Sequence, residues 1–157
     1  AAFLRNCNCL IGRCGYIPVS MLPTSCLCTK LRRASRGVTR LYDEALADVG
    51  LNAAQFSLLR NLQRLGQPSI SALAEAMGLD RSTLGRNLRV VEGRGLVQLG
   101  EGADQRSRQV ALSDAGRQVL EQGAPLWEHA QQQLALRLGA DKRAALLALL
   151  DDLETID

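Results

Sequence analysis

Apolar residues recur at helical spacing over most of the chain after Cys26. Between Cys26 and Val49 an apolar residue returns every three or four positions, and Gly50 follows. This spacing places apolar side chains on one face of a helix, and glycine is the residue that most often ends a helix. The pattern predicts a long first helix over residues 26–49. Its predicted apolar stripe consists of Leu27, Leu31, Ala34, Val38, Leu41, Ala45 and Val49.

A second helix is predicted to begin after Asn52. Asn52 and Gln55 have the spacing of a capping box, in which each side chain bonds a backbone N–H at the helix start. The sequence Gly66-Gln67-Pro68 is expected to end this helix. Its predicted apolar side consists of Phe56, Leu58, Leu59, Leu62 and Leu65.

Two short amphipathic segments between Ser71 and Leu96 flank the sequence Met77-Gly78-Leu79. Glycine supplies the tight turn that joins two helices at a steep angle, so the stretch predicts a helix-turn-helix. Asp80 stands where it can cap the second of these helices.

The second helix of this pair has two contrasting faces. Its predicted buried face consists of Leu84, Leu88 and Val91. At about 100° per residue the opposite face carries Ser82, Arg86 and Arg89, with Thr83 and Asn87 on the flanks. Arginine can bond guanine, asparagine can bond adenine and hydroxyls can bond phosphates, so this face suits the DNA major groove. A solvated helix also carries such residues, and the charged face alone does not decide between the two interpretations.

A β-hairpin is predicted after the helix-turn-helix. Residues 96–99 are predicted to form the first strand, and residues 108–112, which alternate in polarity, the return strand; the polar sequence GEGADQRS separates them. The two motifs together make a winged helix. Arg106 falls near the hairpin tip, where Asp104 is placed to brace it toward the minor groove. Arg108 begins the return strand and completes the predicted DNA-binding set.

The sequence resembles the MarR family of bacterial transcriptional regulators. The resemblance is carried by DRSTLGRNLRVVEGRGLV over residues 80–97, by DQRSRQVALSDAG over 104–116 and by the segment 26–62. It covers about the last four-fifths of the chain. Where the family often has Thr, Asp and Arg, this chain has Gly85, Arg89 and Val90, so the base sequence that it reads stays open.

The resemblance implies a function and an assembly. It implies a winged-helix homodimer that binds a pseudo-palindromic DNA operator, most often as a repressor. In the family the first helix and the C-terminal helices form the dimer interface, here residues 26–49 and 113–157, around a winged helix over 52–112. An aromatic acid or phenol often binds between the two parts in relatives, and Tyr42, Phe56 and Trp127 are the candidate lining residues, although core packing is the default for each.

The C-terminal region is predicted to form two helices. Ser113 begins the first, Pro125 is expected to kink or distort it, and Leu138-Gly139-Ala140 separates it from the second. The second helix has an apolar stripe too wide for a surface helix. It consists of Leu146, Leu147, Leu149, Leu150 and Leu153. An intramolecular bundle or a homodimer would cover it, and we favour the homodimer.

Composition agrees with a mainly helical, DNA-binding protein with a small β-wing. The 157 residues are 46% hydrophobic but only 3% aromatic, and no apolar run is long enough for a membrane span. We expect a single domain over residues 21–157 in the cytoplasm. The net charge is +3, with seven Lys or Arg and no acid in residues 1–40. This asymmetry fits one face turned toward a polyanion, and a solvated basic helix would show it equally well.

Residues 1–20 show no sustained period, and we expect them to be an upstream or non-native extension.

All five cysteines lie before Thr29, which does not suggest a disulfide framework. Cys26 and Cys28 begin a basic helix, where either thiol can be shifted toward the reactive thiolate. Redox sensing and simple packing are both open for this pair. No metal site or other cofactor is predicted, because no histidine accompanies the cysteines.

An enzymatic function finds little support in the sequence. His129 is the only histidine, no nucleophile with a neighbouring base is evident, and there is no glycine loop that would bind phosphate. A winged helix that binds another protein instead of DNA is the remaining alternative, against which Arg86, Arg89 and Arg106 argue.

Overall fold

The computed structural model describes residues 25–101 and 108–155. The chain divides into two units, residues 1–35 and residues 36–157, and most of the described residues belong to the second. The predicted boundaries of the extension, residues 1–20, and of the domain start at 21 lie outside the described residues. The elements in chain order are α1 (Leu27–Leu46), η2 (Ala47–Val49), α2 (Ala53–Leu65), α3 (Ile70–Ala76), α4 (Arg81–Gly93), β1 (Val97–Glu101), β2 (Arg108–Leu112), α5 (Asp114–Leu138) and α6 (Ala140–Glu154).

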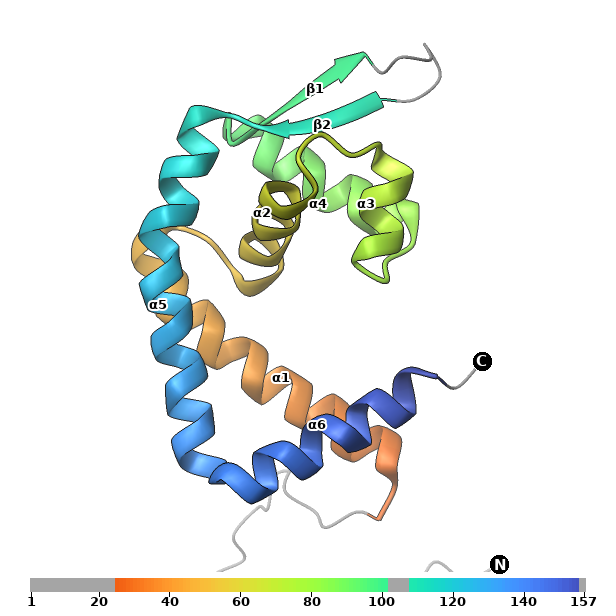
Figure 1. The fold of residues 1–157 in the computed structure, drawn as a ribbon, viewed down its shortest axis with the longest axis vertical. Helices are drawn as coiled ribbons and strands as arrows, with labels where there is room; N and C mark the ends of the chain where they lie inside the picture. Colours follow the sequence, from red (N-terminus) through yellow and green to blue (C-terminus); the bar gives the residue numbers. More distant parts are fainter. Residues whose placement is uncertain (1–24, 102–107, 156–157) are drawn as a thin grey trace, which may run out of the picture. The chain divides into compact units, whose positions relative to one another are not determined.

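The predicted winged helix is confirmed. Helices α2, α3 and α4 lie together with β1 and β2 beside them, and α5 leads away from the end of the wing (Figure 1). Gly78 lies between α3 and α4 with a φ of 60°, the left-handed conformation that a tight turn requires and that glycine adopts without strain. None of the described helices is long and apolar enough to cross a membrane.

Three helices, α2, α4 and α5, begin with a side-chain cap at the residue that the sequence predicts. The Asn52 Oδ1 accepts a bond from the Gln55 N–H at 2.8 Å, and the Gln55 Oε1 accepts one from the Asn52 N–H at 3.1 Å. The Ser113 Oγ accepts from the Gly116 N–H at 3.0 Å and donates to the Gly95 carbonyl at 2.6 Å. The cap of α5 therefore also attaches this helix to the turn before β1.

The core is built mainly from leucines of α2 to α4, and it also includes Leu46 of α1, Val110 of β2 and the rings of Tyr42 and Phe56. Side chains in this core have nine-tenths or more of their surface buried, and a fully buried leucine contributes about 1.5–3 kcal/mol relative to an exposed one. The largest fully buried residues are Phe56, Leu46, Leu58, Leu59, Leu62, Leu73, Leu84, Val91 and Val110.

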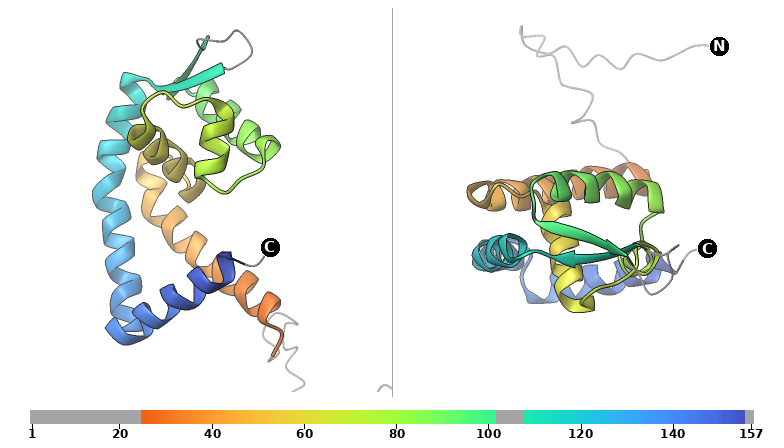
Figure 2. Two further views of the ribbon diagram at one scale, coloured as in Figure 1. Left: turned by 45° about the vertical axis from the view of Figure 1, so that its right-hand side comes forward. Right: turned by 90° about the horizontal axis from the view of Figure 1, so that it is seen from above.

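The wing is a two-stranded antiparallel ladder, seen from above in the right-hand view of Figure 2. Val97 pairs with Leu112 and Leu99 with Val110. In a pleated ladder paired residues share a face, so these four side chains face the core and Gln98 and Ala111 face the other way. The Val110 N–H also bonds the Pro68 carbonyl at 3.0 Å. The start of α3 is thereby attached to the wing.

Helix α5 packs so closely on the wing that one position accepts only glycine. A Cβ at position 116 would collide with the carbonyl oxygen of Leu96. The helix continues through Pro125 as one element, and Gly139, with a φ of 77°, separates it from α6 as predicted.

Two predicted apolar faces differ from the structure. Leu65 is 40% exposed, because α2 ends there and Gly66 turns the chain away. In α1 the buried residues are Tyr42 and Leu46 rather than Leu41 and Ala45. The helix tightens into η2 after Leu46, and the aromatic ring of Tyr42 has a stacking partner that the helical period alone does not reveal.

Candidate nucleic-acid interface

Helix α4 presents a polar face directly opposite its buried one. Leu84 and Val91 are completely buried and Leu88 is nearly so. Ser82, Arg86 and Arg89 are exposed, while Thr83 and Asn87 on the flanks are half-buried. The side chains therefore lie as the helical period predicted, although their contact with DNA stays a prediction.

The first turn of α4 is organised around the Asp80 carboxylate. This group caps the helix by accepting from the Thr83 N–H at 2.8 Å. It also accepts the Ser82 hydroxyl at 2.5 Å and the Thr83 hydroxyl at 2.6 Å. Bonds from the Ser82 and Thr83 side chains, in that order, hold the pKa of Asp80 far below its usual range.

These bonds change the role expected of the two hydroxyls. A hydroxyl has one proton to donate, and phosphate oxygens only accept. While Ser82 and Thr83 donate to Asp80, neither can donate to a phosphate. The Thr83 Oγ1 instead accepts a bond from Arg86 Nη2 at 3.2 Å.

Arg108 is exposed at the start of β2, the position expected of a wing cation. Arg106 and Asp104, predicted to form the tip of the wing, lie outside the described residues.

Arg94 is a residue that the sequence pattern missed. Its Nη1 donates to the Gly50 carbonyl at 2.7 Å and so joins the end of α4 to the turn before α2. The two residues are 44 positions apart, and no local pattern signals their contact.

The three predicted effector-lining residues come together, but they stack on one another. The ring centroids of Tyr42 and Trp127 are 4.2 Å apart, and those of Phe56 and Trp127 are 4.9 Å apart. Phe56 is fully buried, Tyr42 is buried and Trp127 is half-buried. Burial raises the pKa of the Tyr42 phenol. The charge of Arg143 lowers this pKa by less, and the charge of Glu128 raises it by less still. Tyr42 and Phe56 are thus mainly core residues.

A groove of about 460 Å³ opens beside this stack, between α2 and α5. The sequence pattern did not single out its polar members, which come from two separate helices. The groove is lined by Phe56, Arg60, Gln63, Leu120, Ala124, Pro125, Trp127 and Glu128.

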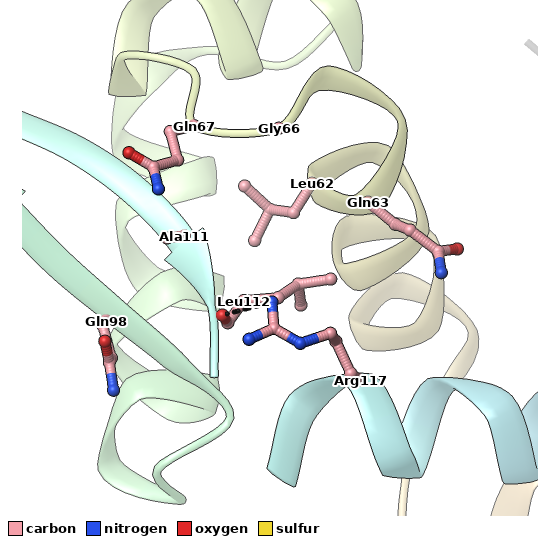
Figure 3. Close-up of a pocket in the computed structure, with 8 residues that line it drawn as sticks. All are labelled: Leu62, Gln63, Gly66, Gln67, Gln98, Ala111, Leu112 and Arg117. Atoms are coloured by element: carbon pink, nitrogen blue, oxygen red, sulfur yellow. Dashed lines mark hydrogen bonds between the residues drawn. The ribbon is translucent and has the colours of Figure 1, made fainter. Parts of the chain in front are cut away.

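A second groove of similar volume lies where α2, the wing and the start of α5 meet (Figure 3). Its polar walls are mainly the amides of Gln63, Gln67 and Gln98. The Arg117 guanidinium there is engaged by the Leu112 carbonyl at 3.1 Å and by the Asp114 carboxylate at 2.7 Å. With its cation occupied, this groove offers less to a charged ligand than the first.

Cys26 and Cys28 are both exposed at the beginning of α1. Hydrogen bonds from Thr29, first from its side chain and then from its backbone, lower the pKa of the Cys26 thiol. Among residues 25–101 and 108–155, no group of three or more His, Cys, Asp or Glu side chains could hold a metal ion.

Comparisons with known proteins agree with this geometry. A sequence model of the MarR family matches residues 49–107. The transcriptional regulator MosR of M. tuberculosis, solved in complex with DNA, is 33% identical with a TM-score of 0.70, over 83% of this chain and 99% of that chain. The transcriptional repressor CouR, bound to a 23-mer DNA duplex, is 31% identical with a TM-score of 0.75, over 82% and 92%.

This chain belongs to the MarR family. Its winged helix is therefore that of a DNA-binding transcriptional regulator. Two further structures of this family concern small molecules. CouR has been solved with p-coumaroyl-CoA. The DNA binding of BpsR from Bordetella bronchiseptica, 27% identical with a TM-score of 0.77 over 85% of this chain and 96% of that chain, is regulated by 6-hydroxynicotinic acid.

For this MarR-family chain, we expect Arg86 and Arg108 to contribute differently to DNA binding. Arg86→Ala should cost about 1–3 kcal/mol on the preferred site and relax base preference, because it removes a base contact. Arg108→Ala should weaken binding to all duplexes, because it removes a phosphate contact. It should also make the slope of log affinity against log salt concentration shallower by about one. Titrations at several salt concentrations measure both, with Arg137→Ala as a charge-matched control. Parent-like binding by both variants would show that the assigned face is wrong.

Proposed function

We propose that this protein is a homodimeric repressor that binds a palindromic operator and is released from it by an aromatic effector. The observation that carries the proposal is the exposed polar face of α4, held outward by the burial of Leu84, Leu88 and Val91. Each α4 would enter the major groove of one half-site. The complexes of MosR and CouR with DNA support this mode of binding.

The exposed leucines of α6 support a homodimer. Every described residue of this helix is exposed, including five leucines that are 36–59% exposed. A monomeric protein rarely leaves so much contiguous apolar surface in water. Two copies that cover these leucines would carry two recognition helices, whose half-site centres lie about one DNA turn, roughly 10 bp, apart.

The first test of this assembly introduces charge into α6. Leu147→Glu with Leu150→Glu should yield monomers, because two carboxylates would lie in the dimer interface, and operator affinity should fall with the loss of paired half-site binding. Sedimentation and DNA titration measure both effects. Gln118→Glu with Gln122→Glu, at two exposed positions of α5, is the charge-matched control. An unmodified chain that is monomeric at micromolar concentration would contradict the proposal.

The groove between α2 and α5 is the candidate effector site. It combines a partly exposed Trp127 indole with the Arg60 guanidinium and the Gln63 amide, so it suits an aromatic ring that carries a carboxylate. Glu128 on the same groove could accept a phenolic hydroxyl. Because α2 belongs to the winged helix and α5 leads to α6, a ligand between them would shift α4 relative to its partner in the dimer. The ligands of CouR and BpsR support an aromatic effector.

Trp127 is the only tryptophan and therefore reports on this groove. Titration with 4-hydroxybenzoate should quench its fluorescence and lower operator affinity. Arg60→Gln should weaken binding about tenfold, because a charge-assisted hydrogen bond is lost. Arg64→Gln, one turn further along α2, is the matched control. An unchanged fluorescence of the parent, or equal affinities for parent and Arg60→Gln, would exclude this groove.

A thiol switch is the second candidate for control, and the lowered pKa of Cys26 favours it. A lower pKa raises the thiolate fraction at neutral pH, and the thiolate is the form that peroxides oxidise. Cys26 lies one residue before α1, and Cys28 lies in its first turn. The oxidised product that we propose is a sulfenate or an intersubunit disulfide.

Separate replacement of the two cysteines tests this alternative. We expect an organic hydroperoxide to lower the operator affinity of the parent and of Cys28→Ser, and a thiol reductant to restore it. Cys26→Ser should bind DNA and ignore the peroxide. Mass spectrometry identifies the oxidised residue. If Cys26→Ser still released DNA on oxidation, Cys26 would have no part in control.

A further inference from the structure

A relay of hydrogen bonds runs along the exposed side of α4. The Thr83 hydroxyl donates to the Asp80 carboxylate at 2.6 Å, and its oxygen accepts from Arg86 Nη2 at 3.2 Å. The three residues are spaced three apart, so they follow one another along the helix surface.

The direction of this relay is determined by its members. A carboxylate only accepts and a guanidinium only donates, so the hydroxyl between them must turn its proton toward Asp80 and its lone pairs toward Arg86. A free arginine loses rotamer entropy when a ligand orders it. Thr83 restricts Arg86 before any ligand arrives.

We infer that Thr83 is a positioning residue, which Asp80 orients and which aims the Arg86 guanidinium, so that base specificity at the Arg86 position depends on the Thr83 hydroxyl. This inference rests on the proposed function, in which α4 enters the major groove. It reassigns Thr83 from a phosphate contact to a residue that acts through Arg86. A guanidinium that is already oriented suits guanine, because guanine can accept two parallel hydrogen bonds from one guanidinium.

Thr83 offers a matched pair of substitutions. Thr83→Val keeps the branched shape but removes the hydroxyl, and Thr83→Ser keeps the hydroxyl. Both retain the backbone N–H that bonds Asp80 at 2.8 Å, so the cap of α4 survives. Equal melting temperatures for the two variants would confirm that the fold is retained.

The test uses the full-length protein and the duplex that the parent selects from a random DNA pool. Affinities are measured for this site, for sites with each base pair changed in turn, and for an unrelated duplex. Thr83→Val should bind the selected site about tenfold more weakly, leave the unrelated duplex unchanged and lose discrimination at the pair that Arg86→Ala also affects. Thr83→Ser should discriminate like the parent. Adding Thr83→Val to Arg86→Ala should have no further effect.

Two results would overturn the inference. One is parent-like discrimination by Thr83→Val. The other is an equal loss of affinity on every duplex, which would indicate a phosphate contact. Failure of the proposed function gives a different result, in which the parent selects no preferred duplex or Arg86→Ala leaves its preference unchanged.

Discussion

Burial of one face of α4 is the constraint on which the candidate interface depends. Leu84, Leu88 and Val91 lie in the core, and each contributes about 1.5–3 kcal/mol by leaving water. Rotation of the helix would expose them, and no surface hydrogen bond of about 1 kcal/mol could compensate. The polar side chains on the opposite face have no freedom to turn inward. The relay through Thr83 then refines the direction of a single side chain on a helix whose rotation the core already determines.

Two contacts at the C-terminal end of α4 connect this helix to the rest of the second unit. Arg94 bonds the carbonyl of Gly50 before α2, and Ser113 bonds the carbonyl of Gly95 where α5 begins. Helix α5 also packs through Gly123 against the ring of Phe56, which lines the candidate effector groove. A contiguous set of packed side chains and hydrogen bonds thus joins the groove to α4, and it offers a route by which a ligand in the groove would act on α4 in the proposed function.

The molecule has two apolar surfaces of different kinds. The leucines of α2 to α4, except Leu65 at the end of α2, are buried within the chain, whereas those of α6 are exposed. Helix α6 carries its leucines around a wide arc, so a single neighbouring helix could not cover all of them. The winged helix therefore has a complete core of its own, whereas α6 leaves apolar surface that the proposed second copy would cover.

The sequence by itself determined the features that arise between residues close in the chain. The caps at Asn52, Asp80 and Ser113 and the glycine turn at Gly78 depend on bonds over three or four residues, and the two faces of α4 follow from the helical period. Only the tertiary structure decided which side of α1 is buried, because that choice depends on the stacking of Tyr42 on Trp127. It also decided the Arg94 contact and the composition of the groove beside Trp127. These rest on elements far apart in the chain, whose packing no local pattern encodes.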